Sequence, residues 1–175
     1  MMQELAQVRA VAIDYGGTIT DSSQPIDPKL RMRPVLPLAV AAFHQLAEMG
    51  YALVLASNTR PDQDRIKALE QAGVLHLFRE DSVLESAKLG IAKPSPAFFD
   101  RVLDAAGNLE PEHVLMVGNN REHDIAPATA KGMIAALIER PDGLIPPPLP
   151  PRAFRLVAFA ALPPVLRAAR QYRGR

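Results

Sequence analysis

The 175-residue sequence contains no cysteine, carries a formal net charge of only +1 and has no apolar run that approaches the ~20 residues needed to cross a bilayer. The lack of cysteine excludes disulfides and thiolate metal sites, and it fits a reducing compartment. The small net charge gives no electrostatic reason to expect a nucleic-acid partner. Because the sequence also lacks the basic, apolar start of a signal peptide, we expect a cytoplasmic protein with no membrane partner.

The length and composition are those of one globular domain, which we expect to span residues 1–175. Apolar residues make up 48% of the chain and charged residues 22%, which are ordinary proportions for a folded domain. Prolines are concentrated in residues 141–151. This composition predicts an extended connection on the surface.

Several short apolar runs have the length of β-strands and almost no polar interruption, as is typical of parallel strands buried on both faces. They are residues 8–13, 52–56, 114–117, 133–138 and 154–159. A weaker strand is predicted near residues 82–84.

Amphipathic segments with helix start and stop signals separate these runs, at residues 36–49, 62–72, 96–106 and 124–131. At the third segment, Ser95 is a suitable N-cap, Pro96 suits the first turn and Gly107 follows the end. Strands that alternate with helices predict an α/β fold. We expect a three-layer, Rossmann-like parallel sheet with helices on both faces.

Polar residues follow the predicted strands at the points where an open α/β sheet forms its crevice. Asp14, Ser57 and Asn119 each follow a strand, and Lys93 precedes a helix. An aspartate can attack phosphorus, and a hydroxyl and an ammonium can stabilise the charge that develops on the phosphoryl oxygens. Oxygen ligands of this kind suit Mg²⁺, which would reduce the repulsion between a carboxylate and a phosphate.

Four ordered stretches of the chain resemble the motifs of the haloacid dehalogenase-like (HAD) superfamily of hydrolases. They are residues 14–18 (Asp-Tyr-Gly-Gly-Thr), 55–59 (Leu-Ala-Ser-Asn-Thr), 89–98 and 117–125. One stretch alone would be a weak indication, but the four agree with one another in order and placement. The resemblance implies a Rossmann-like domain that forms an aspartyl-phosphate intermediate.

By this resemblance, Asp14 is the nucleophile, Ser57 binds the transferring phosphoryl group, and Lys93 bridges the nucleophile and the phosphoryl oxygens. The resemblance also implies a Mg²⁺ site formed by Asp14, the carbonyl of Gly16, Asn119 and Asp124. The residues expected to contact the substrate are Tyr15, Gly16, Gly17, Asn58 and Thr59.

Two residues depart from the pattern of this superfamily. Gly16 stands where typical phosphatases have an aspartate that acts as general acid and base, and its loss costs about 10²–10⁴ in rate for a poor leaving group. Asn119 stands where an aspartate is usual, so we expect weaker Mg²⁺ binding.

The chain between Asp14 and Ser57, and between Ser57 and Lys93, is too short for a separate cap domain. An uncapped site is open. This indicates either a large substrate or closure by a second copy of the chain in a homo-oligomer.

Three functions are compatible with these residues. The first is a Mg²⁺-dependent phosphatase that acts on a small phosphorylated metabolite or on a phosphate with a good leaving group. The second is a pseudo-phosphatase that binds a phosphorylated ligand or partner without turnover, an interpretation supported by Gly16 and Asn119. The third, with less support, is a phosphotransferase.

Overall fold

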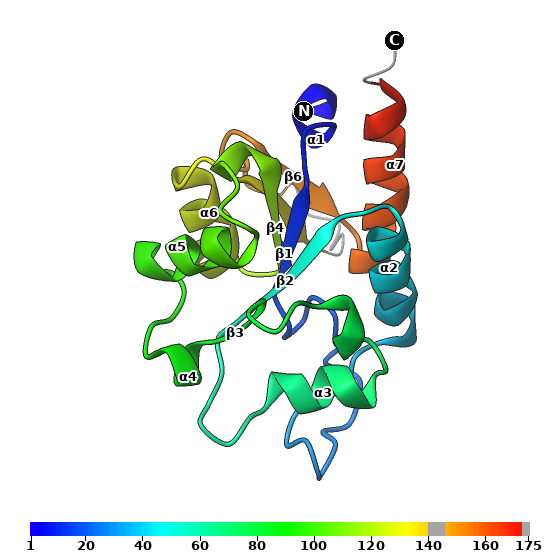
Figure 1. Cartoon of the computed structure of the whole chain (residues 1–175), viewed down its shortest axis with the longest axis vertical. Coiled ribbons are helices and arrows are strands. Elements are labelled where there is room, and N and C mark those ends of the chain that lie inside the picture. Colours follow the sequence, from blue (N-terminus) through cyan, green and yellow to red (C-terminus); the bar gives the residue numbers. More distant parts are fainter. Residues whose placement is uncertain (140–145, 173–175) are drawn as a thin grey trace.

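The computed structural model describes residues 1–139 and 146–172, which form a six-stranded parallel sheet with helices on both faces (Figure 1). The strands are β1 (Ala10–Ile13), β2 (Ala52–Ser57), β3 (Val83–Glu85), β4 (Val114–Gly118), β5 (Ile134–Ile138) and β6 (Ala153–Leu156). Their order in the sheet is β3-β2-β1-β4-β5-β6, which is the order of the doubly wound Rossmann fold. The predicted fold class is confirmed.

β1 lies where the two halves of the sheet meet. It pairs in parallel with β2 on one side and with β4 on the other. The crossover connections leave this point in opposite directions, so the carboxyl ends of β1 and β4 border a crevice. The residues that directly follow β1, β2 and β4 therefore lie at one edge of the sheet.

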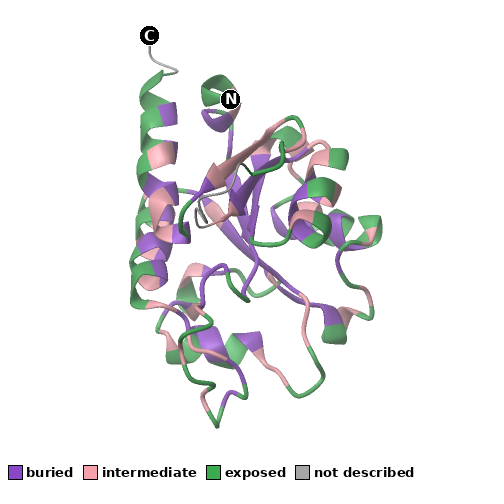
Figure 2. Cartoon of the chain, turned by 180° about the vertical axis from the view of Figure 1, so that it is seen from behind, coloured by how far each residue is buried: buried purple, intermediate pink, exposed green. Residues whose placement is uncertain are grey.

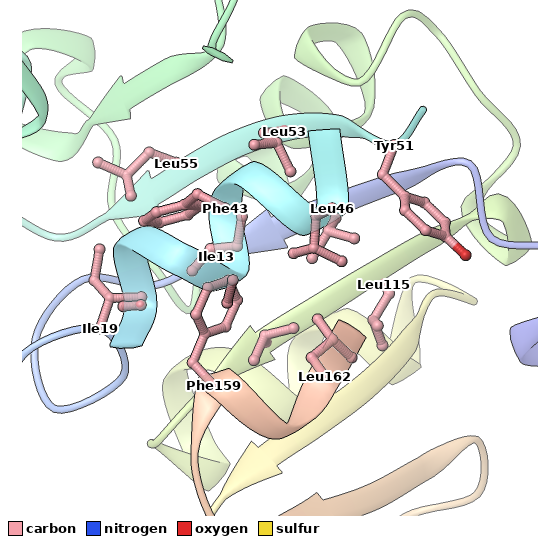
Figure 3. Packing of buried hydrophobic residues seen from close by; sticks show 14 of the residues in the cluster. Ile13, Ile19, Phe43, Leu46, Tyr51, Leu53, Leu55, Leu115, Phe159 and Leu162 are labelled. Atoms are coloured by element: carbon pink, nitrogen blue, oxygen red, sulfur yellow. The ribbon is translucent and has the colours of Figure 1, made fainter. Parts of the chain in front are cut away.

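One face of the sheet is covered by α1 (Met2–Leu5), α2 (Pro37–Glu48), α3 (Arg65–Gln71) and α7 (Leu162–Tyr172). Phe43 of α2 is fully buried at the centre of this layer. Its ring centroid lies 5.5 Å from that of Phe78 and 5.1 Å from that of Phe159, and Figure 3 shows Phe43 and Phe159 side by side. The strand residues Ile13, Leu55 and Leu115 point to this face.

The other face is covered by α5 (Pro96–Ala105) and α6 (Ala126–Ala130). Here β1 presents the small residues Ala10 and Ala12, because successive strand residues point to opposite faces. The aromatic rings of Phe98 and Phe99 fill the space that these small residues leave. In Figure 2 the central strands form a buried layer between partly exposed helices, as the continuous apolar runs predict.

The remaining elements are short. They are α4 (Ser86–Leu89), the 3-10 turns Leu75–Leu77, Pro111–His113 and Phe159–Ala161, and the π-helical turn Arg121–Ile125. The loop between β1 and α2 contains a single antiparallel bridge, Asp27 to Met32, and no domain-sized insertion. Across the described ranges, no helix combines the length and apolar character that spanning a membrane requires.

Two C-terminal features differ from the sequence prediction. The strand expected at residues 154–159 is the shorter β6, and Phe159 instead begins a 3-10 turn that places its ring against Phe43. The sequence patterns do not predict α7, whose first turn contains Pro163 and Pro164. Proline is tolerated there because first-turn amides have no partner within the helix.

Two further predictions are met in part. The helix expected at residues 124–131 is α6, which is shorter and follows the π-helical turn. Of the predicted proline-rich connection, residues 140–145 lie outside the described residues, and residues 146–150 contain neither helix nor strand.

α2 offers a matched test of this packing, because Leu46 is fully buried whereas Leu38 on the same helix is 71% exposed. Leu46→Ala is expected to lower the free energy of unfolding by about 2–5 kcal/mol, since it leaves a cavity in the core. Leu38→Ala should change it by less than about 0.5 kcal/mol. Urea denaturation followed by circular dichroism measures both values, and equal losses would contradict this assignment of the core.

Candidate active site

Asp14 directly follows β1 and lies at the edge where β1 and β4 end. Its backbone amide donates to the carbonyl of Val117 at 2.9 Å, which extends the pairing of the two strands by one residue. Thr18, in the same loop, donates its hydroxyl to Asp14 Oδ2 at 3.2 Å. Asp14 is only 8% exposed, so its charge depends on such polar partners.

Lys93 brings a buried positive charge to Asp14. Its Nζ donates to Asp14 Oδ1 at 2.8 Å and to Asp124 Oδ1 at 2.6 Å. The side chains of Lys93 and Asp124 are each 2% exposed, so the attraction between opposite charges is only weakly screened by water. The structure thus brings together three residues that the sequence predicts for the site.

The side chain of Asn58 holds the backbone of Lys93. Asn58 Nδ2 donates to the carbonyl of Lys93, and Asn58 Oδ1 accepts from the amide of Lys93, both at 2.9 Å. These two bonds tie the end of β2 to the segment that precedes α5. In the structure the side chain of Asn58 thus positions the lysine, and the contact of Asn58 with a substrate stays a prediction.

Asp124 is held by the turn that precedes α6. Its Oδ2 accepts from the amide of Asn120 at 3.0 Å. A Cβ added to Gly118 would lie 2.3 Å from Asp124 Cγ, so a glycine at position 118 permits this close approach. Burial raises the pKa of Asp124; the ammonium of Lys93 opposes this shift, and the charge of Asp14 adds to it.

Ser57 at the end of β2 is buried and contacts a second buried cation, Arg65. Arg65 Nε donates to Ser57 Oγ at 3.0 Å, and the guanidinium lies 4.0 Å from the centre of the Tyr15 ring. Glu85 accepts the backbone amide of Arg65 at 2.7 Å. Burial lowers the pKa of Arg65, but a guanidinium stays protonated in proteins. Arg65 therefore supplies a fixed positive charge beside Ser57.

Arg65 is the site residue that sequence reasoning missed. It precedes Ala68 and Leu69 by three and four residues, and all three are buried on one face of α3. This helical spacing is the signal that could have identified it, because an arginine on an apolar face needs a polar partner inside the protein.

Two residues expected to contact the substrate use their side chains within the protein. Tyr15 is 2% exposed and donates its hydroxyl to the carbonyl of Arg33 at 2.7 Å. Burial raises the pKa of Tyr15 to about 12. The hydroxyl of Thr59 accepts from the amide of Ala87 at 3.1 Å, which ties the loop after β2 to α4. These two side chains support the loops that surround the site.

Gly16 and Gly17 form the turn after Asp14, but the structure constrains them differently. Gly17 has a φ of 75°, and an added Cβ would lie 2.2 Å from Asn119 Nδ2. The side chain of Asn119 thus packs directly on this turn. A Cβ added to Gly16 would meet nothing within 4 Å. Gly17 is therefore required by its backbone and its neighbour, whereas position 16 has room for a side chain.

The donor set around Asp14 fits a hard divalent cation. Asp14 and Asp124 share the ammonium of Lys93, and Asn119 lies on the adjoining turn. Carboxylate, amide and carbonyl oxygens are the ligands that Mg²⁺ prefers. Within residues 1–139 and 146–172, no three acidic, histidine or cysteine side chains form a metal cluster. A cation here would thus need Asn119 and the Gly16 carbonyl in addition to the two carboxylates.

Comparison with known proteins identifies a family and several curated relatives that are similar to this chain. A family model described as haloacid dehalogenase-like hydrolase matches residues 28–132. A phosphoserine phosphatase of Thermus thermophilus is 39% identical over 110 residues, and a glyceraldehyde 3-phosphate phosphatase of Methanothermobacter thermautotrophicus is 34% identical over 107 residues. These alignments cover 63% and 61% of this chain but only 43% and 45% of the relatives. The chain thus spans less than half the length of these curated relatives.

Solved structures of low sequence identity share the fold over almost their whole length. An uncharacterized protein from Listeria monocytogenes serotype 4b has a TM-score of 0.73 at 22% identity, covering 94% of this chain and 99% of that one. A HAD phosphatase from Thermococcus onnurineus has a TM-score of 0.70 at 18% identity, covering 91% and 98%.

The two glycines after Asp14 give a paired prediction. Gly17→Ala is expected to lower the free energy of unfolding by more than about 1 kcal/mol, because alanine is strained at positive φ and its Cβ would displace Asn119. Gly16→Ala should be neutral or stabilising by up to about 1 kcal/mol. Urea denaturation measures the free energy of unfolding of both variants. A Gly17→Ala variant as stable as Gly16→Ala would show that Asn119 does not pack on this turn.

Proposed function

Because the chain belongs to the haloacid dehalogenase-like hydrolases, we propose that it is a Mg²⁺-dependent phosphatase that acts through an aspartyl phosphate on a small phosphorylated compound. The observation that carries this proposal is the buried Lys93 ammonium between Asp14 and Asp124 at the carboxyl edge of β1. The phosphatase names of the curated relatives support it further.

In the proposed reaction, a carboxylate oxygen of Asp14 attacks phosphorus and the bond from phosphorus to the leaving oxygen breaks. Lys93 and Ser57 stabilise the negative charge on the phosphoryl oxygens. Water then attacks phosphorus, which releases phosphate and restores the carboxylate of Asp14. When bound, Mg²⁺ would supply charge neutralisation and orientation, and Asp14, Asp124, Asn119 and the Gly16 carbonyl are the groups that would hold it.

Gly16 determines which substrates suit this site. No acid at this position can protonate a departing alkoxide, so substrates whose leaving group is already a weak base are favoured. Acyl and aryl phosphates are of this kind. Binding without turnover is not favoured as an alternative, because the curated relatives are named as phosphatases.

The decisive experiment is an assay of phosphate release from acetyl phosphate, p-nitrophenyl phosphate and several sugar phosphates, with and without Mg²⁺. We expect Mg²⁺-dependent release from at least the first two, and a loss of more than about 10³-fold in Asp14→Asn, because that variant lacks the nucleophile. If the wild-type protein releases no more phosphate than Asp14→Asn from any of these compounds, the phosphatase proposal is wrong.

Restoring an acid at position 16 is a second test, and the room around Gly16 means that the fold should accept it. Gly16→Asp should raise the turnover of alkyl phosphates by about 10²-fold, and that of aryl phosphates much less, because only the former need a proton on the leaving oxygen. Gly16→Asn is the matched control, since it has the same size without the acid. Equal gains with Asn and Asp, or equal gains for both substrate classes, would contradict the assigned role.

A further inference from the structure

A cavity of about 390 Å³ lies beside the Asp14 turn and is unusually rich in arginine. Its lining includes Gly16 and Gly17 from the turn, together with Arg31, Arg33, Arg60 and Arg65. None of the described residues that line it is acidic. This volume is within the range of small-ligand sites.

The carboxylates nearest to these arginines only partly neutralise them. Asp62 lies outside the lining and pairs with both Arg31 and Arg60, at 3.4 and 3.3 Å. Both of these arginines are exposed, so water screens the pairs strongly and they can yield to a ligand. Asp27 accepts bonds from Gln71 and from two backbone amides of its own loop. The described lining of the cavity itself therefore presents guanidinium groups and no carboxylate.

The position of Gly16 indicates which part of a substrate this cavity receives. In the superfamily that this chain belongs to, residue 16 is the position of the group that protonates the leaving oxygen. A larger cavity of about 570 Å³ also borders Gly17, but its described lining contains neither Gly16 nor an arginine, and includes Leu38, Val157 and Phe159. Of these two cavities, only the arginine-lined one is bordered by both Gly16 and Gly17.

We propose that the substrate carries a second anionic group, a carboxylate or a phosphate, on its leaving-group side, and that Arg31, Arg33 and Arg60 bind it. This inference rests on the proposed function, because it assumes that the phosphoryl group lies between Asp14 and Ser57. Guanidinium groups match both anions through paired N–H donors. Arg65 has a different role, since it is bonded to Ser57 and positions that hydroxyl.

Binding of phosphonates that cannot be hydrolysed tests this directly on the wild-type protein with Mg²⁺. Propylphosphonate and 3-phosphonopropionate differ only in a methyl group against a carboxylate, and calorimetry gives both dissociation constants. We expect 3-phosphonopropionate to bind about tenfold more tightly or better. Propane-1,3-diphosphonate is the third ligand, and its affinity relative to 3-phosphonopropionate shows which second anion the cavity prefers.

Substitutions test which arginines cause the preference for a ligand with a second anionic group. Arg60→Gln and Arg33→Gln should each reduce the preference for the second anion severalfold, measured as the ratio of the dissociation constants of propylphosphonate and 3-phosphonopropionate. Asp62→Asn should increase the preference, because it removes the carboxylate that competes for Arg31 and Arg60. Arg101→Gln is the matched control. Arg101 is an exposed arginine of α5 that pairs with Asp104, and its loss should change nothing.

The outcomes separate this inference from the proposed function. Equal affinities for propylphosphonate and 3-phosphonopropionate, a preference unchanged in both arginine variants, or no detectable binding of either compound would each overturn the inference. Hydrolysis of acetyl phosphate, which has no second anionic group, tests the phosphatase proposal independently. Mg²⁺-dependent hydrolysis without a preference for the second anion would leave the phosphatase in place and remove only the arginine subsite.

Discussion

The contact of one buried ammonium with two buried carboxylates is the interaction on which the site depends. Lys93 neutralises one of the charges of Asp14 and Asp124, and removing it would leave two like charges in a region of low polarity. The fold supplies the conditions for this contact from three distant segments. β1 delivers Asp14, the turn before α6 delivers Asp124, and the side chain of Asn58 fixes the backbone of Lys93 by two bonds.

Glycine stands at three positions near this contact, and the physical reason for it differs between them. At positions 17 and 118 a Cβ would collide with Asn119 and Asp124, so glycine is a steric requirement of the packed site. Gly16 meets no such limit, since the space around it is open. Its significance is therefore chemical. The fold would allow residue 16 to carry a carboxylate, and in the proposed reaction this carboxylate would be the proton donor that is missing.

Sequence patterns predicted the sheet, its strands and the meeting of Asp14 and Lys93, because continuous apolar runs and strand-end polar residues are local signals of a parallel sheet. The place of Asp124 was implied only by the resemblance to the superfamily. Sequence patterns do not predict side-chain contacts between segments that are far apart in the chain. The bonds from the side chain of Asn58 to the backbone of Lys93 join residues 35 positions apart, so no local pattern indicates them. The spacing of Arg65 from Ala68 and Leu69 indicates a buried position, but its contacts with Ser57 and Tyr15 join separate segments of the chain and have no local signal. Sequence patterns also did not predict α7, because two prolines stand in its first turn. Its buried residues, such as Leu166 and Ala169, pack on the core.

Gly16, Asn119 and the arginine-lined cavity all make the pocket less negative than the superfamily pattern would. Gly16 and Asn119 each remove one negative charge that a typical phosphatase of this superfamily places in the pocket, and the cavity beside Gly16 adds positive charge. A pocket with fewer carboxylates repels a doubly anionic substrate less. Guanidinium groups cannot replace the missing acid, because they stay protonated near neutral pH. They can stabilise an anionic leaving group as it departs, and we infer that binding energy from the second anion compensates in part for the proton that Gly16 cannot supply.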